Sequence, residues 1–199
     1  MDAFVYPLQP HVRRHGPQGY ADINSFRPWL RDDFSFRCVY CLLREQWATL
    51  RAVFGIDHYV AVVLRPHAAL TYDNLLYCCA TCNSAKAEER VPNPEVALTA
   101  ETVQVHEDGT IEGFSREARR IIRVLGLDDE EQREWRLLWL GIIALAKQHD
   151  LALFQKLMGY PDDLPDLSRL RPPNGNSRPE GVGNSYFGAR EQGMLAETY

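Results

Sequence analysis

Four of the five cysteines form two Cys-x-x-Cys pairs, a spacing typical of metal sites. The pairs are Cys38/Cys41 in "CVYC" and Cys79/Cys82 in "CATC". Zn²⁺ takes four ligands in a tetrahedron, and one Cys-x-x-Cys turn supplies two thiolates. The pattern therefore predicts a structural zinc, with Cys78 outside it. The alternatives are four unrelated buried thiols, or a redox-active pair.

A second set of residues lies between these pairs and directly after them. Asp57 and His58 stand in the apolar run "IDHYVAV", Asn74 precedes the second pair, and Asn83 follows it. Buried charge is costly unless it is paired or binds a metal. Carboxylate and amide oxygens suit Mg²⁺ or Mn²⁺, and a free imidazole beside such an ion can activate water. This set indicates hydrolysis of a phosphate ester, although each residue alone could be a salt-bridged, turn or helix-cap residue.

The order of these motifs resembles the zinc-bearing HNH endonucleases. The resemblance covers residues 31–95, through "CVYC", "IDHYV", "YDNLLY", "CATCN" and "SAK". It implies an α+β fold with a small ββα-metal core and a structural zinc. The sequence departs from the family pattern at Asn83, which replaces the last histidine, at Ala61, where proline is common, and at "VLRPHAAL", which replaces a glycine-rich loop. We interpret His67 in that loop as a surface residue.

The resemblance also implies a role for each matched residue. His58 would be the general base that activates water, and Asp57 and Asn83 would hold the catalytic Mg²⁺ or Mn²⁺. Asn74 would hold the loop and orient His58 through its side-chain amide, and the four cysteines would bind zinc. Lys86 would contact a phosphate or lie solvated. We expect a β-bulge at Asp57, because it would let both side chains of the Asp-His pair reach one metal site.

Hydrophobic periodicity and turn residues predict the elements that position this site. The chain divides into an arm at 1–30, the nuclease core at 31–95, an accessory region at 96–160 and a Pro/Gly-rich tail at 161–199, which its composition indicates is flexible. The predicted elements are a helix at 42–54, a strand at 56–63, a β-hairpin at 102–114, and helices at 115–127, 128–150 and 151–158.

The net charge of -5 argues against a generally basic nucleic-acid binder. The accessory region nevertheless has one basic face, opposite an apolar stripe, that could track a phosphate backbone or be paired with acids such as Glu117. Arg13 and Arg14 are further candidates for phosphate contacts. The arginines of the basic face are Arg116, Arg119, Arg120 and Arg123.

We therefore expect a cytoplasmic, metal-dependent endonuclease that cleaves double-stranded DNA. RNA is the alternative substrate. We favour DNA because the sequence shows no aromatic stacking platform of the kind that single-strand RNA readers use. The longest apolar run, at 137–146, is too short to span a bilayer, and no secretory signal is evident.

Small HNH proteins of this kind resemble effectors of bacterial anti-phage defence, so a protein partner such as an ATPase is expected. The main alternative is a non-catalytic zinc-stabilised module that binds nucleic acid or protein. Trp135 and Trp139 pack in the core or form an interface, for example with a second copy.

Overall fold

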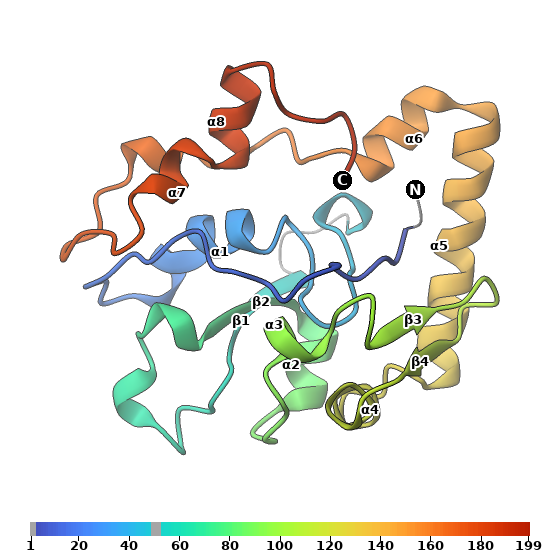
Figure 1. Cartoon of the computed structure of the whole chain (residues 1–199), viewed down its shortest axis with the longest axis horizontal. Helices are drawn as coiled ribbons and strands as arrows, with labels where there is room; N and C mark the ends of the chain where they lie inside the picture. Colours follow the sequence, from blue (N-terminus) through green and yellow to red (C-terminus); the bar gives the residue numbers. More distant parts are fainter. Residues whose placement is uncertain (1–2, 49–52) are drawn as a thin grey trace.

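The structure is a computed structural model that describes residues 3–48 and 53–199 (Figure 1). Within these residues, two separate two-stranded sheets lie among helices. The predicted combination of helices with small sheets is thus confirmed. Among the described residues, no helix is both long enough and apolar enough to cross a membrane.

A strand–strand–helix unit positions the candidate site. β1 (Phe54–His58) pairs antiparallel with β2 (Leu75–Cys79), and α2 (Ala80–Lys86) follows β2 without a linker. Every residue of β2 is buried, as its apolar sequence requires. α2 contacts both strands, so its side chains face the residues that β1 presents on that side of the sheet.

The strand predicted at 56–63 is shorter than expected. It ends at His58 because the side-chain amide of Asn74 bonds both the backbone N–H and the carbonyl of Val60, which turns the chain away from β2. The bulge predicted at Asp57 is wrong: the pairing with β2 is regular through all five residues of β1. Successive side chains of β1 therefore point to opposite faces of the sheet.

The helix predicted at 42–54 is wrong in its described part. The chain has a 3₁₀ turn at Glu45–Trp47 and enters β1 at the end of this range, while residues 49–52 lie outside the described residues. Leu42 has a φ of +61°, which no right-handed helix contains. The Leu42 N–H donates to the Cys38 carbonyl at 3.1 Å, so the cysteine turn overrides helical periodicity here.

The accessory region confirms its predicted hairpin and helices. Gly109 in the hairpin turn has a φ of +79°, which the Asp-Gly sequence predicts. The Ser115 hydroxyl accepts a hydrogen bond from the Ala118 N–H at 3.0 Å and caps the first helix. The elements are β3 (Val103–Val105), β4 (Ile111–Gly113), α4 (Arg116–Val124), α5 (Glu130–His149) and α6 (Leu151–Met158).

The two tryptophans of α5 pack in the core. Trp139 stacks on Trp47 with ring centroids 4.7 Å apart, and Trp135 meets Phe4 edge-on at 5.3 Å. Phe4 also contacts Trp47, so the N-terminal arm, the segment after the first cysteine pair and α5 share one aromatic cluster. This confirms the core interpretation. Leu138, on the outer face of α5, is 61% exposed.

The tail, predicted to be flexible at 161–199, is packed against the rest of the chain instead. The Arg178 guanidinium lies 3.0 Å from the Asp73 carboxylate, and the Tyr186 N–H donates to Asp32 at 2.8 Å. Composition missed this packing because the partners are distant in the sequence. The remaining helices are α1 (Arg27–Asp33), α3 (Pro94–Ala97), α7 (Glu180–Gly183) and α8 (Tyr186–Glu191).

Candidate metal centre and active site

The four cysteines of the two pairs lie together in the core. All four are buried, and their Sγ atoms lie within 4.8 Å of one another. The Cys41 and Cys79 sulfurs are 3.7 Å apart. Tetrahedral zinc with Zn–S bonds of ~2.3 Å would place its sulfurs about 3.8 Å apart. These four cysteines could therefore hold a metal such as zinc, as the sequence predicts.

The fold presents the second cysteine pair at the junction of β2 and α2. Cys79 ends β2 and caps α2, because its sulfur accepts a hydrogen bond from the Cys82 N–H at 3.4 Å. Hydrogen bonds with the other three thiols, Cys38 first, lower the pKa of Cys79, whereas hydrogen bonds with Cys38 and Cys79 raise the pKa of Cys41. A bound cation would favour loss of the thiol protons.

Cys78 lies outside the cluster, as expected. It precedes Cys79 on β2, so strand alternation turns its side chain to the other face of the sheet. Burial raises the pKa of its thiol, and Cys78 is fully buried. It therefore behaves as a small apolar core residue beside α2 rather than as a metal ligand.

Asp57 is buried and held by two partners. The Lys86 ammonium, from the last turn of α2, lies 3.0 Å from one carboxylate oxygen, and the Tyr40 hydroxyl donates to the other at 2.8 Å. Burial raises the pKa of Asp57, whereas Lys86 and Tyr40 oppose that rise. Lys86 also donates to the His58 carbonyl at 2.9 Å. Lys86 is completely buried, so the phosphate contact predicted for it is wrong in this structure.

His58 is partly buried and has a defined tautomer. Its Nε2 atom lies 2.9 Å from the Ala69 carbonyl oxygen. A carbonyl can only accept a hydrogen bond, so neutral His58 carries its proton on Nε2, and Nδ1 keeps the basic lone pair. Asp57 precedes it on a regular strand, so the two side chains leave the sheet on opposite faces.

Asn74 acts on His58 through the loop between β1 and β2. Its amide oxygen accepts from the Val60 N–H at 2.9 Å, and its amide nitrogen donates to the Val60 and Ala68 carbonyls at 3.1 and 3.2 Å. These bonds pin both ends of the loop, and Ala69, next in the chain, holds the His58 ring. The predicted loop-holding role fits these contacts, but the amide of Asn74 does not bond His58 directly within the described residues.

A cavity of about 240 Å³ opens where β1, the loop and the end of α2 meet. Asp57, His58 and Asn83 are among the residues that line it. The Asn83 amide nitrogen lies 3.5 Å from the position that a Cβ on Gly55 would take, so this side chain lies against β1. Residues Asp57, His58 and Asn83 thus border one cavity, but the side chains of Asp57 and His58 leave opposite faces of β1, and Asn74 lies behind the loop.

Glu88 also lines the cavity and was missed from the sequence. It follows Ala87, whose φ of +46° ends α2 and redirects the chain. The only sequence signal was an acid shortly after the cysteine–asparagine motif.

Among the described residues, the four cysteines are the only group of three or more His, Cys, Asp or Glu side chains whose ligand atoms are close enough to hold an ion.

The arginine candidates differ in their surroundings. Arg13 is mostly buried and pairs with Glu95, and Arg14 lies 2.7 Å from the Asp32 carboxylate, so both serve internal ion pairs rather than phosphate contacts. The loop residue His67 is exposed, as expected. The predicted basic face is exposed on α4, outside the cavity; it comprises Arg116, Arg119, Arg120 and Arg123.

In comparisons with known proteins, no family model matches this chain and no curated protein matches it. The resemblance to HNH endonucleases therefore rests on the sequence motifs.

We predict about one zinc ion per chain in the purified protein, because four thiolates at this spacing complete a tetrahedral site. Cys82→Ser should lose the zinc and several kcal/mol of unfolding free energy, since metal binding is coupled to folding. Cys78→Ala, also a buried cysteine, should keep the zinc. Elemental analysis and urea denaturation measure both effects. A folded wild type without stoichiometric zinc would contradict the assignment.

We predict that Lys86→Met lowers the free energy of unfolding by about 3 kcal/mol, because it leaves the Asp57 carboxylate buried without a cation. The double variant Asp57→Asn/Lys86→Met removes both charges and should lose less than Lys86→Met alone. Urea denaturation at neutral pH measures both. The exposed Lys147→Met control should change stability by no more than about 0.5 kcal/mol. Equal stability of Lys86→Met and this control would show that the ion pair is unimportant.

Proposed function

We propose that this protein is a metal-dependent endonuclease that hydrolyses the phosphodiester bonds of DNA. The observation that supports the proposal is that Asp57, His58 and Asn83 border one cavity of a β1–β2–α2 unit. A cluster of four buried cysteines lies at the start of the same helix. Convergence of the residues that the motif order selects supports a common chemical role for them.

In the proposed reaction, His58 is the general base. Its Nδ1 lone pair takes a proton from water while the water oxygen attacks the phosphorus atom, and the bond to the 3′-oxygen breaks. The 3′-oxygen then takes a proton from solvent, which leaves 5′-phosphate and 3′-hydroxyl ends. The Ala69 carbonyl holds the imidazole in the tautomer that this step requires. Asn74 keeps that carbonyl in place by pinning the loop.

Asp57 and Asn83 would hold the divalent cation. When bound, Mg²⁺ or Mn²⁺ supplies positive charge for the scissile phosphate and the leaving oxygen. The Lys86 ammonium already balances the Asp57 carboxylate, and Asn83 is neutral, so the protein offers the cation little net negative charge. We therefore expect weak cation affinity until the substrate phosphate adds its own charge. Glu88 also lines the cavity and could add a carboxylate.

A non-catalytic, zinc-stabilised binding module is the second candidate. Both carboxylate oxygens of Asp57 already have partners, Lys86 and Tyr40, as they would in a purely structural ion pair. The tautomer of His58 and its position at the cavity favour catalysis instead. A role in bacterial anti-phage defence and a protein partner such as an ATPase rest on the resemblance alone. Action in the cytoplasm and assembly with a second copy remain expectations from the sequence.

Cleavage of supercoiled plasmid tests the proposal. With Mg²⁺ or Mn²⁺, wild-type protein should nick or linearise the plasmid, and His58→Ala should lower the rate by at least about 10²-fold, the contribution typical of a general base. The control is His67→Ala, an exposed histidine on the neighbouring loop, which should retain the rate. A duplex RNA of matched length should be cut more slowly.

Two results would contradict the nuclease. The first is His58→Ala cleaving as fast as wild type, which would assign the activity elsewhere. The second is a folded, zinc-loaded wild type that cleaves neither nucleic acid with either metal, which would favour the binding module.

A further inference from the structure

α4 presents an arginine row, Arg116, Arg119, Arg120 and Arg123, to solvent. The opposite face of α4 is buried through Ala118 and Ile121, both fully inaccessible. Within the part of the chain that the structure describes, none of the four arginines makes an ion pair. Glu117, the acid expected to pair with them, is also exposed and forms no ion pair there. The row is therefore a set of cations that no acidic side chain neutralises within the described residues.

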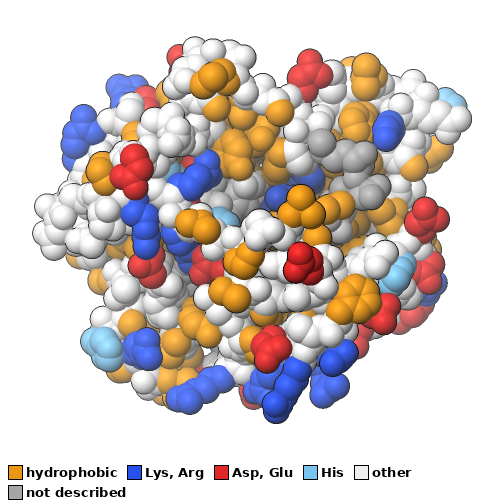
Figure 2. Space-filling model, in the orientation of Figure 1, with side chains coloured by type: hydrophobic (Ala, Val, Ile, Leu, Met, Phe, Trp, Pro, Cys, Tyr) orange, Lys and Arg blue, Asp and Glu red, His pale blue; other side chains and the backbone are white. Residues whose placement is uncertain are grey.

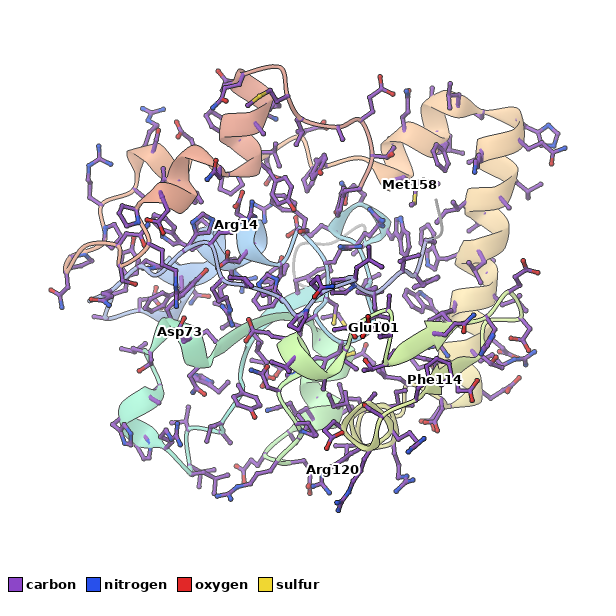
Figure 3. The ribbon with its side chains drawn as sticks, viewed as in Figure 1. Arg14, Asp73, Glu101, Phe114, Arg120 and Met158 are labelled. Carbon is purple, nitrogen blue, oxygen red and sulfur yellow. The ribbon has the colours of Figure 1, made fainter. Side chains whose placement is uncertain are left out.

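The arginine row is fixed relative to the candidate active site. The Arg120 guanidinium donates to the Arg90 carbonyl at 2.9 Å, and Arg119 donates to the Gly113 carbonyl at 3.3 Å. Arg90 follows α2 by only a few residues, so the bond from Arg120 ties α4 to the segment that leaves the site. Lys and Arg side chains gather along the lower edge of the molecule, where Arg120 and α4 lie (Figures 2 and 3).

A surface hollow connects this row with the cavity. Arg90 and Arg120 line a hollow of about 710 Å³ together with Leu64. Ala87 and Glu88 line both this hollow and the cavity that holds Asp57 and His58. The two spaces therefore adjoin at Ala87 and Glu88, so a ligand bound in the hollow beside Arg120 would lie next to the cavity.

Charge and length identify the ligand. From Arg116 to Arg123 the helix rises about 10 Å, which equals about three base-pair steps of ~3.4 Å along the axis of a DNA duplex. A membrane-binding helix would need an exposed apolar face, but that face of α4 is buried. Glu88 and Glu89 also line the hollow, so a phosphate backbone would contact its arginine side.

We infer that the arginine row and Arg90 bind the phosphate backbone of double-stranded DNA and direct it to the cavity. This inference rests on the proposed nuclease function, whose substrate surface it names. The contacts are to phosphates, so they fix the position of the duplex without selecting a sequence.

Fluorescence anisotropy with a labelled 20-bp duplex (about two turns), in a His58→Ala background that keeps the DNA intact, tests this surface. Arg116→Gln/Arg123→Gln removes two arginines whose side chains make no hydrogen bond within the described residues. It should weaken binding at least about tenfold and lower the salt slope by about 2, one for each lost phosphate contact. The matched control, Arg169→Gln/Arg171→Gln, removes the same charge from the exposed tail and should bind like the parent.

Three outcomes would overturn the inference. They are a double variant that binds no more weakly than its control, a parent that does not bind the duplex, and a parent that binds poly-glutamate as tightly as DNA, which would indicate an acidic protein partner.

Plasmid cleavage separates this inference from the proposed function. Cleavage with unaltered binding in the double variant would refute only the surface, whereas arginine-dependent binding without cleavage would refute only the nuclease.

Discussion

The four-cysteine cluster is the constraint on which the candidate site depends. It joins the turn at Cys38–Cys41 to the junction of β2 and α2, two segments that are distant in the sequence. α2 has only seven residues, and an isolated helix of that length is not stable in water. Its position therefore comes from its packing on β1 and β2 and from the contacts at its two ends. A metal at the cluster would fix the first turn of α2, and with it the side chains of Asn83 and Lys86.

A buried ion pair fixes the other end of the same helix. Lys86 joins the last turn of α2 to Asp57 and to the carbonyl of His58. One side chain thus neutralises the proposed cation ligand and holds the backbone of the proposed base. Burying this pair costs desolvation, and its hydrogen bonds to Tyr40 and His58 offset part of that cost. The predicted weak affinity for a cation follows from the same arrangement.

Local sequence rules predicted the parts of the fold that depend on neighbouring residues. Cysteine spacing predicted the cluster, Asp-Gly predicted the hairpin, and Ser115 marked the start of α4. Other predictions failed where distant contacts decide. Helical periodicity at 42–54 could not reveal that Leu42 reverses the chain.

Side-chain direction and long-range packing were beyond the sequence for the same reason. Whether Lys86 faces solvent or Asp57 depends on how α2 lies on the sheet. The composition of the tail predicted flexibility. Composition could not reveal its packing, because Arg178 and its partner Asp73 are distant in the sequence and meet only in the folded chain. Glu88 reaches the cavity through the turn at Ala87, which no motif marks. The convergence of the site residues was predictable only as a set, from their order.

Anomalous diffraction from crystals grown with Mn²⁺ and a phosphate-containing oligonucleotide would test the central claim most directly. Data collected at the zinc and manganese edges locate each metal independently of the assumed chemistry. The proposed function predicts a zinc peak between the four cysteine sulfurs and a separate manganese peak between Asp57 and Asn83. A manganese peak elsewhere, or none with the oligonucleotide in the cavity, would contradict the assigned catalytic site.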